Sequence, residues 1–402
     1  MKNGWQTKRL GELLDIQNGF AFSSKDYSES GHFVMRIGNV QNGYVALTDP
    51  KFIKLPADGS LERFVLTEGD ILVSLTGNVG RVGVILEEHL PAALNQRVAR
   101  ISIRKGTTAT RELLLFFLFS DWFRKELMGA GHGAAQQNVS TKDIAEIQIP
   151  IPPLPEQGRI VGILDEAFAG LATAKAHAEK NLQNARALFE SYLQSVFEKP
   201  GKGWVKKSLG DLATFRNGIN YTKDSKGECI KIVGVRNFQK YFSAPLDDLD
   251  TVTIDGKLSE LDSLKQDDIL AVRSNGNIEL IGRCILVGEV TEKISYSGFT
   301  IRIRLSNGEV LSKYLCHFMK SASTRKLLTE GGTGTNIKSL NQGMLSALVI
   351  PVPPIPIQKR LVENLETLSD ETQRLAANYR QKLAALDELK KSLLHQAFSG
   401  EL

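Results

Sequence analysis

The amino-acid sequence contains the same pattern twice, and this duplication constrains the fold more than any other feature. The segment that starts at Trp5 (WQTKRLGELLDIQNGF) matches the one that starts at Trp204 (WVKKSLGDLATFRNGI). Later, residues 149–161 (IPIPPLPEQGRIV) match residues 350–362 (IPVPPIPIQKRLV). The repeat, about 200 residues long, is far longer than a solenoid repeat of roughly 20–50 residues. We therefore expect two similar domains, each followed by its own tail.

The composition indicates an ordinary globular protein. Of the 402 residues, 42% are hydrophobic and 24% are charged, which excludes a mainly disordered or collagen-like chain. The three cysteines, Cys229, Cys284 and Cys316, are far apart and form no C-x-x-C pair, so neither a disulfide framework nor a structural zinc site is expected. The sequence begins without an apolar signal segment and has no run of about 18 apolar residues. We expect a soluble, cytoplasmic protein.

The first part of each copy, residues 1–149 and 199–349, has the pattern of a mixed domain. Short apolar runs predict strands: FVMRIG, ILVSL, VGVIL and RVARISI in the first copy, and IKIVGV, DILAVR, GRCILVG and FTIRIRL in the second. Asn42-Gly43 and Thr76-Gly77 predict turns. One helix is predicted over Thr110–Met128, with a counterpart over Leu311–Leu328. The expected fold class is α/β (α+β).

The tail of each copy, residues 150–198 and 350–402, predicts one long helix. Apolar residues recur every three or four positions, as in a helix with one apolar stripe. Such a helix cannot bury its stripe on itself, so the two helices most simply pair, although each could instead pack on its own domain. For the stripes to pair, the second helix must run back along the first, which gives an antiparallel coiled coil and a pseudo-two-fold repeat. The predicted helix-interface residues are Leu164, Phe168, Leu171, Leu182, Phe189, Tyr192, Leu361, Leu365, Leu368, Leu375, Tyr379, Leu386 and Leu393.

Three glycines interrupt the first tail. Gly158, Gly162 and Gly170 each weaken a helix by up to about 1 kcal/mol relative to alanine. They predict either a bend near the start of this helix or a close approach by the second long helix or by a partner. The expected C-terminal end of the second helix is Gly400.

Sequence motifs of catalysis are absent. There is no G-x-x-x-x-G-K-[ST], no H-E-x-x-H and no G-x-S-x-G. The Gly-rich segments 129–134 and 331–336 follow a predicted helix, so a dinucleotide site is not expected. The six histidines are scattered along the chain, which indicates no metal site. We expect a non-catalytic chain with no cofactor or metal of its own. The acidic pairs Asp247-Asp248 and Asp267-Asp268 leave a divalent-metal nuclease site as an alternative.

Two similar domains joined by a rigid helix pair suit a linear target with two parts. Duplex DNA is such a target, since half-sites one helical turn apart lie about 34 Å from centre to centre. The net charge of +5 permits a polyanionic partner without requiring one. Residues 199–349 carry 22 Lys and Arg against 16 Asp and Glu, whereas residues 1–149 carry 17 against 16. The second domain is therefore expected to supply more of the attraction to phosphate.

The repeat, the Pro-rich segments 149–161 and 350–362, and the ending LDELKKSLLHQAFSGEL (386–402) resemble the specificity subunit of type I restriction–modification enzymes. The resemblance covers essentially the whole chain. It implies that residues 1–149 and 199–349 are target recognition domains, each reading one half of a split, asymmetric site in double-stranded DNA. It also implies that residues 150–198 and 350–402 are spacer helices that set the gap between half-sites and dock the modification subunits.

The same resemblance implies the partners. Two methyltransferase (M) subunits would carry S-adenosylmethionine and methylate adenine at N6, and restriction (R) subunits would bring ATP- and Mg-dependent translocation and cleavage. The alternative from another class is a coiled-coil adaptor whose two domains bind proteins and not DNA.

Polar residues of the predicted loops are the candidates for DNA contact, because Arg reads guanine, Asn and Gln read adenine, and Lys, Ser and Thr also hold phosphates. In the first domain they are Arg36, Asn39, Gln41, Asn42, Ser74, Thr76, Asn78, Arg81, Gln96, Arg97, Gln137 and Asn138. In the second domain they are Arg236, Asn237, Gln239, Lys240, Arg273, Ser274, Asn275, Asn277, Asn336 and Lys338.

Recurrence divides these candidates into two groups. The pairs Asn39/Asn237, Asn78/Asn277 and Asn138/Asn336 occur in both copies, whereas two domains of one specificity subunit should read different bases. Recurring residues are therefore expected to fix turns or hold phosphates. Positions that differ, such as Leu75 against Arg273, are the better specificity candidates.

Overall fold

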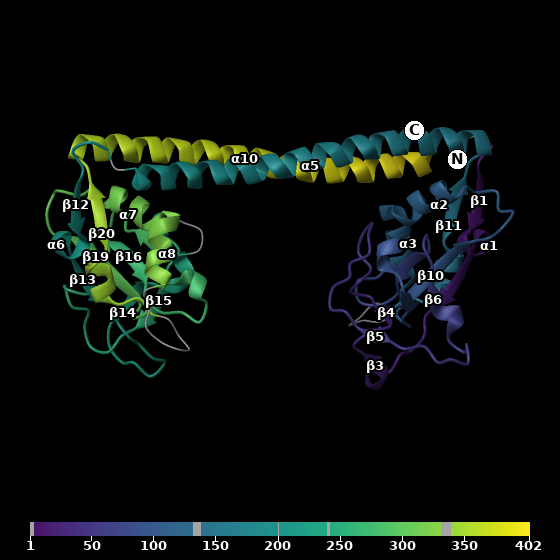
Figure 1. The fold of residues 1–402 in the computed structure, drawn as a ribbon, viewed down its shortest axis with the longest axis horizontal. Helices are drawn as coiled ribbons and strands as arrows, with labels where there is room; N and C mark the ends of the chain where they lie inside the picture. Colours follow the sequence, from purple (N-terminus) through teal and green to yellow (C-terminus); the bar gives the residue numbers. More distant parts are fainter. Residues whose placement is uncertain (1–3, 132–137, 200, 239–241, 331–338) are drawn as a thin grey trace. The chain divides into compact units, whose positions relative to one another are not determined.

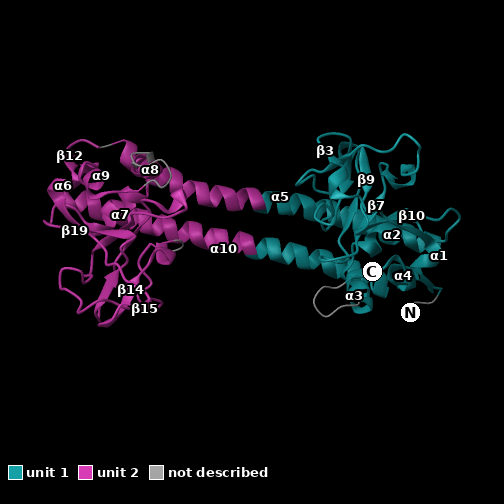
Figure 2. Cartoon of the chain, turned by 90° about the horizontal axis from the view of Figure 1, so that it is seen from below, with its two compact units in different colours: residues 1–178, 381–402 teal, residues 179–380 magenta. Residues whose placement is uncertain are grey.

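The computed structural model describes residues 4–131, 138–199, 201–238, 242–330 and 339–402. The chain forms two compact units (Figure 2): unit 1 contains residues 1–178 and 381–402, and unit 2 contains residues 179–380. Each unit holds one mixed domain and a stretch of both long helices, α5 (Leu154–Glu198) and α10 (Ile355–Ser399). Among the described residues, no helix combines the length and apolar character needed to cross a membrane.

The domain of unit 1 combines two sheets with short helices (Figure 1). One sheet is antiparallel with the order β2-β10-β7-β8, and the other has the order β3-β5-β4-β9-β6, in which β4 and β9 are parallel. A separate antiparallel pair joins β1 to β11, just before α5. The strands are β1 (Gln6–Arg9), β2 (Leu14–Asn18), β3 (Tyr27–Ser28), β4 (His32–Met35), β5 (Phe52–Ile53), β6 (Val65–Leu66), β7 (Ile71–Ser74), β8 (Val82–Val84), β9 (Ala92–Leu94), β10 (Val98–Ile103) and β11 (Gln148–Ile151). The helices are α1 (Leu10–Leu13), α2 (Arg111–Leu118), α3 (Asp121–Ala130), α4 (Thr141–Glu146) and the 3-10 turns η1 (Ser24–Asp26), η2 (Glu62–Phe64) and η3 (Glu87–His89).

The domain of unit 2 repeats this plan. Its sheets have the orders β13-β19-β16-β17 and β15-β14-β18, with β14 parallel to β18, and β12 pairs with β20 just before α10. The strands are β12 (Val205–Ser208), β13 (Ala213–Asn217), β14 (Cys229–Val233), β15 (Asp250–Thr253), β16 (Ile269–Val272), β17 (Cys284–Leu286), β18 (Ile294–Tyr296), β19 (Thr300–Leu305) and β20 (Val349–Val352). The helices are α6 (Leu209–Leu212), α7 (Ser312–Lys320), α8 (Ala322–Glu330), α9 (Gln342–Ser346) and the 3-10 turns η4 (Val235–Phe238) and η5 (Ile278–Leu280).

The predicted strands and turns are confirmed, but the single helix predicted over Thr110–Met128 is wrong. The chain forms α2 and α3 there, with a break at Ser120. The Ser120 hydroxyl donates to the carbonyl of Phe117 and accepts from the amide of Phe123, so it closes one helix and caps the next. Ser321 separates α7 from α8, and its hydroxyl donates to the carbonyl of Phe318, so the prediction over Leu311–Leu328 is corrected too.

The long helices run antiparallel within each unit. In unit 1, Arg159 donates to the Leu402 carbonyl at 2.7 Å, the Lys390 ammonium lies 5.0 Å from the Phe168 ring centre, and Lys175 pairs with Asp387 at 3.0 Å. Along these contacts the residue numbers on α10 fall as those on α5 rise, so the two helices are antiparallel.

Each helix stretch also packs on the domain of its own unit. The core of unit 1 takes Leu164 from α5 and Ala397 and Phe398 from α10, and the Phe398 ring lies 5.1 Å from that of Phe117 in α2. In unit 2, Phe197 of α5 stacks edge-on against Tyr314 of α7. The stripes therefore serve helix pairing and domain packing together, and the two packing modes expected as alternatives coexist.

The predicted helix-interface residues differ in their burial. Leu164 and Leu365 are fully buried, whereas Leu375 is 41% exposed and the other predicted residues are half-buried. Small side chains are buried on the stripes at Ala178, Ala185 and Ala376. The helix α10 ends at Ser399, and Gly400 follows with a positive φ of 81°, as predicted for a C-terminal cap.

Of the roles predicted for the three glycines of α5, a close approach by the second long helix is wrong, whereas a bend or a close approach by a partner stays a prediction. The helix continues through Gly158, Gly162 and Gly170, and a Cβ atom added at any of them would meet nothing within 4 Å. No described residue therefore uses these positions for a close approach.

A buried glutamine fixes the start of each long helix. In unit 1, Gln157 accepts a hydrogen bond from the Thr110 amide at 2.8 Å and donates to the carbonyls of Thr108 at 2.7 Å and Pro152 at 2.8 Å. In unit 2, Gln358 makes the matching three bonds. The glutamine shared by the two Pro-rich segments thus ties the helix to the N-terminus of α2 or α7.

Candidate nucleic-acid interface

Three polar loops of unit 1 meet at one edge of its sheets. Because β4 and β9 are parallel, the segments that follow their carboxyl ends, 36–46 and 95–97, lie together. Because β7 is antiparallel to β10, with Ser74 opposite Val98, the loop 75–81 reaches the same place. We call segments 36–46, 75–81 and 95–97 the unit 1 rim.

Unit 2 gathers the equivalent loops. The segments after β14 and β18 lie together because these strands are parallel, and Val272 at the end of β16 lies opposite Thr300 at the start of β19. We call the described residues of 234–249, 273–283 and 297–299 the unit 2 rim. The two rims therefore arise from the same strand ends in the two copies.

A fourth segment joins each rim. The Val139 amide donates to the Leu75 carbonyl, and the Leu340 amide donates to the Arg273 carbonyl, both at 2.9 Å. Through this register Asn138 bridges Thr76, and Ser339 bridges Ser274. The structural counterpart of Asn138 is thus Ser339, and the Asn138/Asn336 equivalence predicted from the sequence is wrong.

Three of the predicted residues hold the loops from inside. The buried Asn39 accepts from the Arg36 amide and donates to the carbonyls of Ala46 and Thr48. Asn237, also buried, accepts from the Gly234 amide, and Ser74 accepts from the Arg81 amide. Their hydrogen-bonding groups are engaged by the loop backbone.

The five predicted arginines differ in how their charge is used. Arg36 pairs with Asp49 at 2.8 Å, and this hydrogen bond lowers the pKa of Asp49. Arg236 pairs with Asp250 at 2.9 Å, and Arg81 donates to Gln41. For Arg97 and Arg273, no side-chain hydrogen bond or ion pair is made with any described residue.

The predicted amides and hydroxyls line the rims at different depths. Asn42, Asn78, Gln96 and Asn138 are exposed. The Thr76 hydroxyl is buried with no partner in the described part of the chain.

In unit 2 the polar residues partly shape their own loop. Ser274 and Asn275 are half-exposed, and the Asn275 side chain accepts from the amide of Asn277. Asn277 in turn caps η5 by accepting from the Glu279 amide. Gln137, Gln239, Lys240, Asn336 and Lys338 lie outside the described residues.

Aromatic side chains at the rims were missed by the sequence reasoning. A hollow of about 520 Å³ at the unit 2 rim is lined by Tyr221, Phe299, Arg236, Ser274 and Asn275, so two predicted loops meet around two aromatic rings. Phe299 is 59% exposed. A sequence signal existed for one of the rings, since Tyr221 closely follows the recurring Asn-Gly pair at 217–218.

In unit 1, aromatic rings lie beside Gln96 of the rim. A second hollow of about 520 Å³ is lined by Phe20, Phe64, Arg63 and Gln96, and the Arg63 guanidinium lies 4.7 Å from the Phe64 ring centre. Phe20 follows the first Asn-Gly pair directly.

Ion pairs brace the sheet of unit 2 beneath its rim. Arg304 makes two hydrogen bonds of 2.7 Å to the buried Asp268, which raises the pKa of Arg304. Burial lowers the pKa of Arg302 and raises the pKa of Tyr296 to about 12. The Asp268 carboxylate is committed to the sheet and is a structural group, not an open metal ligand.

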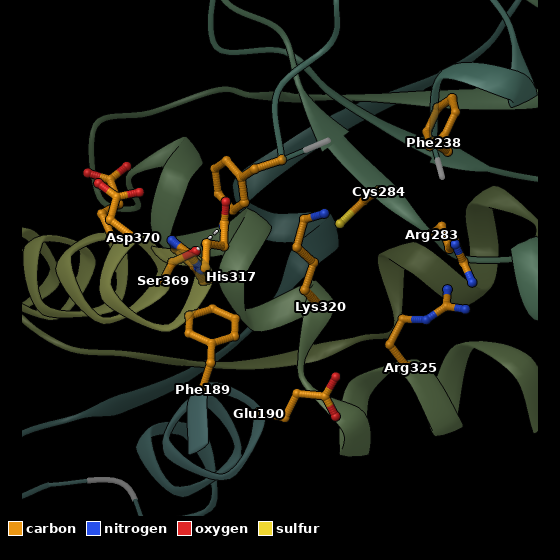
Figure 3. A pocket seen from close by; sticks show the side chains of 13 residues that line it. Phe189, Glu190, Phe238, Arg283, Cys284, His317, Lys320, Arg325, Ser369 and Asp370 are labelled. Atoms are coloured by element: carbon orange, nitrogen blue, oxygen red, sulfur yellow. Dashed lines mark hydrogen bonds between the residues drawn. The ribbon is translucent and has the colours of Figure 1, made fainter. Parts of the chain in front are cut away.

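A separate cavity of about 740 Å³ lies in unit 2 between its domain and its helix stretches (Figure 3). Lys320 and Arg283 line it from the domain, and Asp370 lines it from α10. His317 is buried there with both ring nitrogens unpartnered among the described residues, and burial lowers the pKa of His317 to about 4. The Cys284 sulfur lies 3.9 Å from that of Cys316. No group of three or more described His, Cys, Asp and Glu residues could hold a metal ion.

Comparison with known proteins places this architecture. The family model described as "Type I restriction modification DNA specificity domain" matches the chain twice, over residues 2–182 and 201–385. The chain belongs to this family. Each matched segment contains one mixed domain and a large part of the long helix that follows it, so the family unit coincides with the internal repeat.

Individual members of the type I specificity family match over the full chain. The StySPI specificity subunit of Salmonella potsdam is 24% identical, over 100% of this chain and 90% of that protein. The EcoKI specificity subunit of Escherichia coli K12 is also 24% identical, with the same coverage. A chain from a study of assembly and conformational transition of the type I restriction–modification system has a TM-score of 0.77 at 18% identity, covering 100% of this chain and 99% of that one. The HsdS subunit of Thermoanaerobacter tengcongensis has a TM-score of 0.59 at 16% identity, covering 100% and 98%. These two structures share the fold.

Proposed function

We propose that this chain is the DNA-recognition subunit of a type I restriction–modification complex and reads a bipartite, asymmetric site. Residues 1–149 and 199–349 act as its target recognition domains, one for each half-site. Residues 150–198 and 350–402 act as the helical ruler that sets the spacer.

One observation carries this proposal above the family match. The two rims arise from equivalent strand ends and share the hydrogen bonds at Leu75 and Arg273, but their loops differ in length and their side chains differ at equivalent positions. A scaffold built twice with different exposed residues suits two different half-sequences on one DNA.

Within each rim, we propose that a set of exposed or half-exposed residues touches DNA. They are Asn42, Asn78, Gln96, Arg97 and Asn138 in unit 1, and Arg236, Arg273, Ser274 and Asn275 in unit 2. Arginine and amide groups offer the donors that base edges and phosphates accept, whereas Asn39, Asn237 and Ser74 support the loops.

The chemistry is proposed to reside on partner subunits. Two methyltransferase subunits would dock on this chain and carry S-adenosylmethionine, and restriction subunits would bring ATP and Mg. The chain itself is proposed to be non-catalytic and to work in the cytoplasm. Support comes from the sequence, which lacks the phosphate-loop and nucleophile motifs of such enzymes.

The first test is DNA binding by the assembled complex across a range of salt concentrations, combined with sequencing of methylated bases in a host that expresses it. We expect one split motif that disappears without this chain, and a steep fall of affinity with salt, because neutralised phosphates release counterions. Salt-independent association, or the same methylated motif without this chain, would favour the protein-binding adaptor. Metal-dependent nicking by the chain alone would favour the nuclease alternative.

The second test concerns the ruler. Removing one heptad from α5 and the facing heptad from α10 shortens both helices by about 10 Å, which corresponds to roughly three base pairs at 3.4 Å each. We expect a shorter spacer with both half-sequences unchanged. The matched control removes a heptad from α5 alone, which puts the stripes out of register and should abolish methylation. A changed half-sequence with an unchanged spacer would contradict the ruler.

A further inference from the structure

Each rim contains a pair of facing residues, one of which is an arginine. The arginine occupies the opposite member of the pair in the two rims. In unit 1, the Leu75 amide donates to the Arg97 carbonyl at 3.0 Å, and in unit 2 the Arg273 amide donates to the Phe299 carbonyl at 2.8 Å. The strand registers beneath them, Ser74 opposite Val98 and Val272 opposite Thr300, make Leu75 equivalent to Arg273 and Arg97 equivalent to Phe299. Each pair therefore joins one arginine to one apolar residue, with the order reversed.

Unlike the other predicted rim arginines, these two have guanidinium groups that no described side chain or backbone group occupies. Arg36 and Arg236 are neutralised by aspartates, whereas Arg97 and Arg273 have no side-chain partner among the described residues. An unpaired guanidinium keeps all its donors free for a planar, two-pronged acceptor.

The apolar members of the two pairs behave differently. Leu75 is 4% exposed and belongs to the core of unit 1, so only Arg97 projects from that pair. Phe299 is largely exposed and lines the hollow that Tyr221 and Ser274 share. Unit 2 thus carries a cation and an aromatic residue at two facing positions of the backbone.

We propose that Arg97 in unit 1, and Arg273 together with Phe299 in unit 2, determine which bases each half-site must contain. This inference rests on the proposed function and deepens it. Each arginine binds the O6 and N7 atoms of a guanine, the commonest specific contact in the major groove. Phe299 packs on the methyl group of a neighbouring thymine, an apolar contact that cytosine lacks.

The position of the arginine within the pair also decides which base pair it contacts. Facing residues of an antiparallel pair have Cβ atoms about 5 Å apart, which exceeds the rise of roughly 3.4 Å between base pairs. Placing the arginine on the other member of the pair therefore shifts its guanine by one or two base pairs within the half-site. The same pair of facing strand-end positions then reads a different base pair in each unit.

The test uses this chain assembled with its modification subunits, and methylated motifs are sequenced in the host. Arg273→Leu installs the residue found in unit 1, and Phe299→Arg installs the opposite exchange. We expect Arg273→Leu to relax one guanine position in one half-site, with discrimination there falling roughly 5- to 150-fold. Arg97→Leu should relax one position in the other half-site, and Phe299→Arg should weaken a thymine requirement beside the first position.

Two controls separate base reading from charge and from folding. Lys257→Leu removes one exposed charge beyond the far end of β15 and should leave the motif unchanged. Arg273→Lys keeps the charge and the fold but loses the two-pronged contact, so it should relax the same guanine position as Arg273→Leu.

The outcomes are distinct. A uniform loss of methylation at every site after Arg273→Leu, with full rescue by Arg273→Lys, would mean that the arginine holds a phosphate, and would overturn the inference. So would relaxation of the same half-site by Arg97→Leu and Arg273→Leu. If the unmodified chain directs no methylated motif, the proposed function itself fails.

Discussion

The buried Gln157 is expected to be a main stabilising element of unit 1. Its side chain satisfies three backbone groups: the amide of Thr110 and the carbonyls of Thr108 and Pro152. Gln157→Met keeps most of the volume but leaves all three groups without a partner. A buried polar group that loses its hydrogen bond costs about 1–3 kcal/mol, so the three together predict a loss of about 3–9 kcal/mol in the free energy of unfolding.

The assay combines urea denaturation with amide hydrogen exchange. The peptide that contains Thr110 should lose its protection, whereas the peptide around Leu311, held by Gln358 in unit 2, serves as an internal reference. Gln183→Met, at an exposed position of α5, is the matched control and should change stability by less than about 0.5 kcal/mol.

A second variant tests the direction of the hydrogen bonds. In Gln157→Glu, an ionised carboxylate would face the carbonyl oxygens of Thr108 and Pro152, so the folded state should raise the pKa of the new side chain above about 4.3. A raised pKa means that the deficit relative to the parent is smallest below this pH and grows as the pH rises. A loss under about 1 kcal/mol for Gln157→Met, or the same Gln157→Glu deficit at acidic and neutral pH, would refute the reasoning.

Three further predictions concern other positions. His317 has a pKa lowered by burial to about 4, so the unfolded state, with a pKa near 6.5, takes up the proton first. The contribution of neutral His317 to the free energy of unfolding is complete above the unfolded-state pKa. It falls, by on the order of 3 kcal/mol, as the pH drops toward 4. His317→Phe installs the residue that unit 1 carries at the equivalent position, Phe116. It should flatten the pH dependence of stability in denaturation curves recorded from neutral to acidic pH. Gly218→Ala should destabilise unit 2 by at least about 2 kcal/mol in thermal unfolding, because the new methyl group would overlap the Ser297 carbonyl; an unchanged melting temperature would contradict the close packing. Lys175→Ala, which removes an exposed ion pair with α10, should cost less than about 1 kcal/mol in the same assay, and a larger loss would show that the helix pairing depends on it.

The duplicated plan could be predicted from the sequence because the features that carry it are local and repeated. Asn18-Gly19 and Asn217-Gly218 recur since the backbone of another loop passes too close for any side chain, at Asn95 in unit 1 and Ser297 in unit 2. The long helices were visible for a similar reason, since a three-to-four spacing over many turns has no other interpretation.

The break at Ser120 and the function of Gln157 could not be predicted in the same way. A serine between two apolar turns is compatible with one helix or with a cap, and only the packing of α2 and α3 decides between them. Gln157 looks like an ordinary polar residue of a helix, because its three partners lie in segments that meet it only in the folded unit.

The candidate site was predictable in its loops but not in its chemistry. The sequence pointed to the turns around Asn39 and Arg273, yet could not distinguish a side chain that holds the loop from one that projects from it. The pairing of Leu75 with Arg97 and of Arg273 with Phe299 depends on strand register, which no short motif encodes. Phe299 was missed because the sequence pattern places it at the start of the predicted strand FTIRIRL, whereas β19 begins at Thr300.

The place of the last helical turns in unit 1 bears on how the protein is made. Ala397 and Phe398 complete the core around Phe117, although they are synthesised roughly 220 residues after Ala178, where α5 leaves that unit. At about 5–20 residues per second, a ribosome needs roughly 10–45 s to cover this distance. During that time the first domain waits with part of its apolar face open, and it closes only when the end of α10 emerges. A nonsense mutation late in the reading frame would therefore harm the first domain to be translated more than the second.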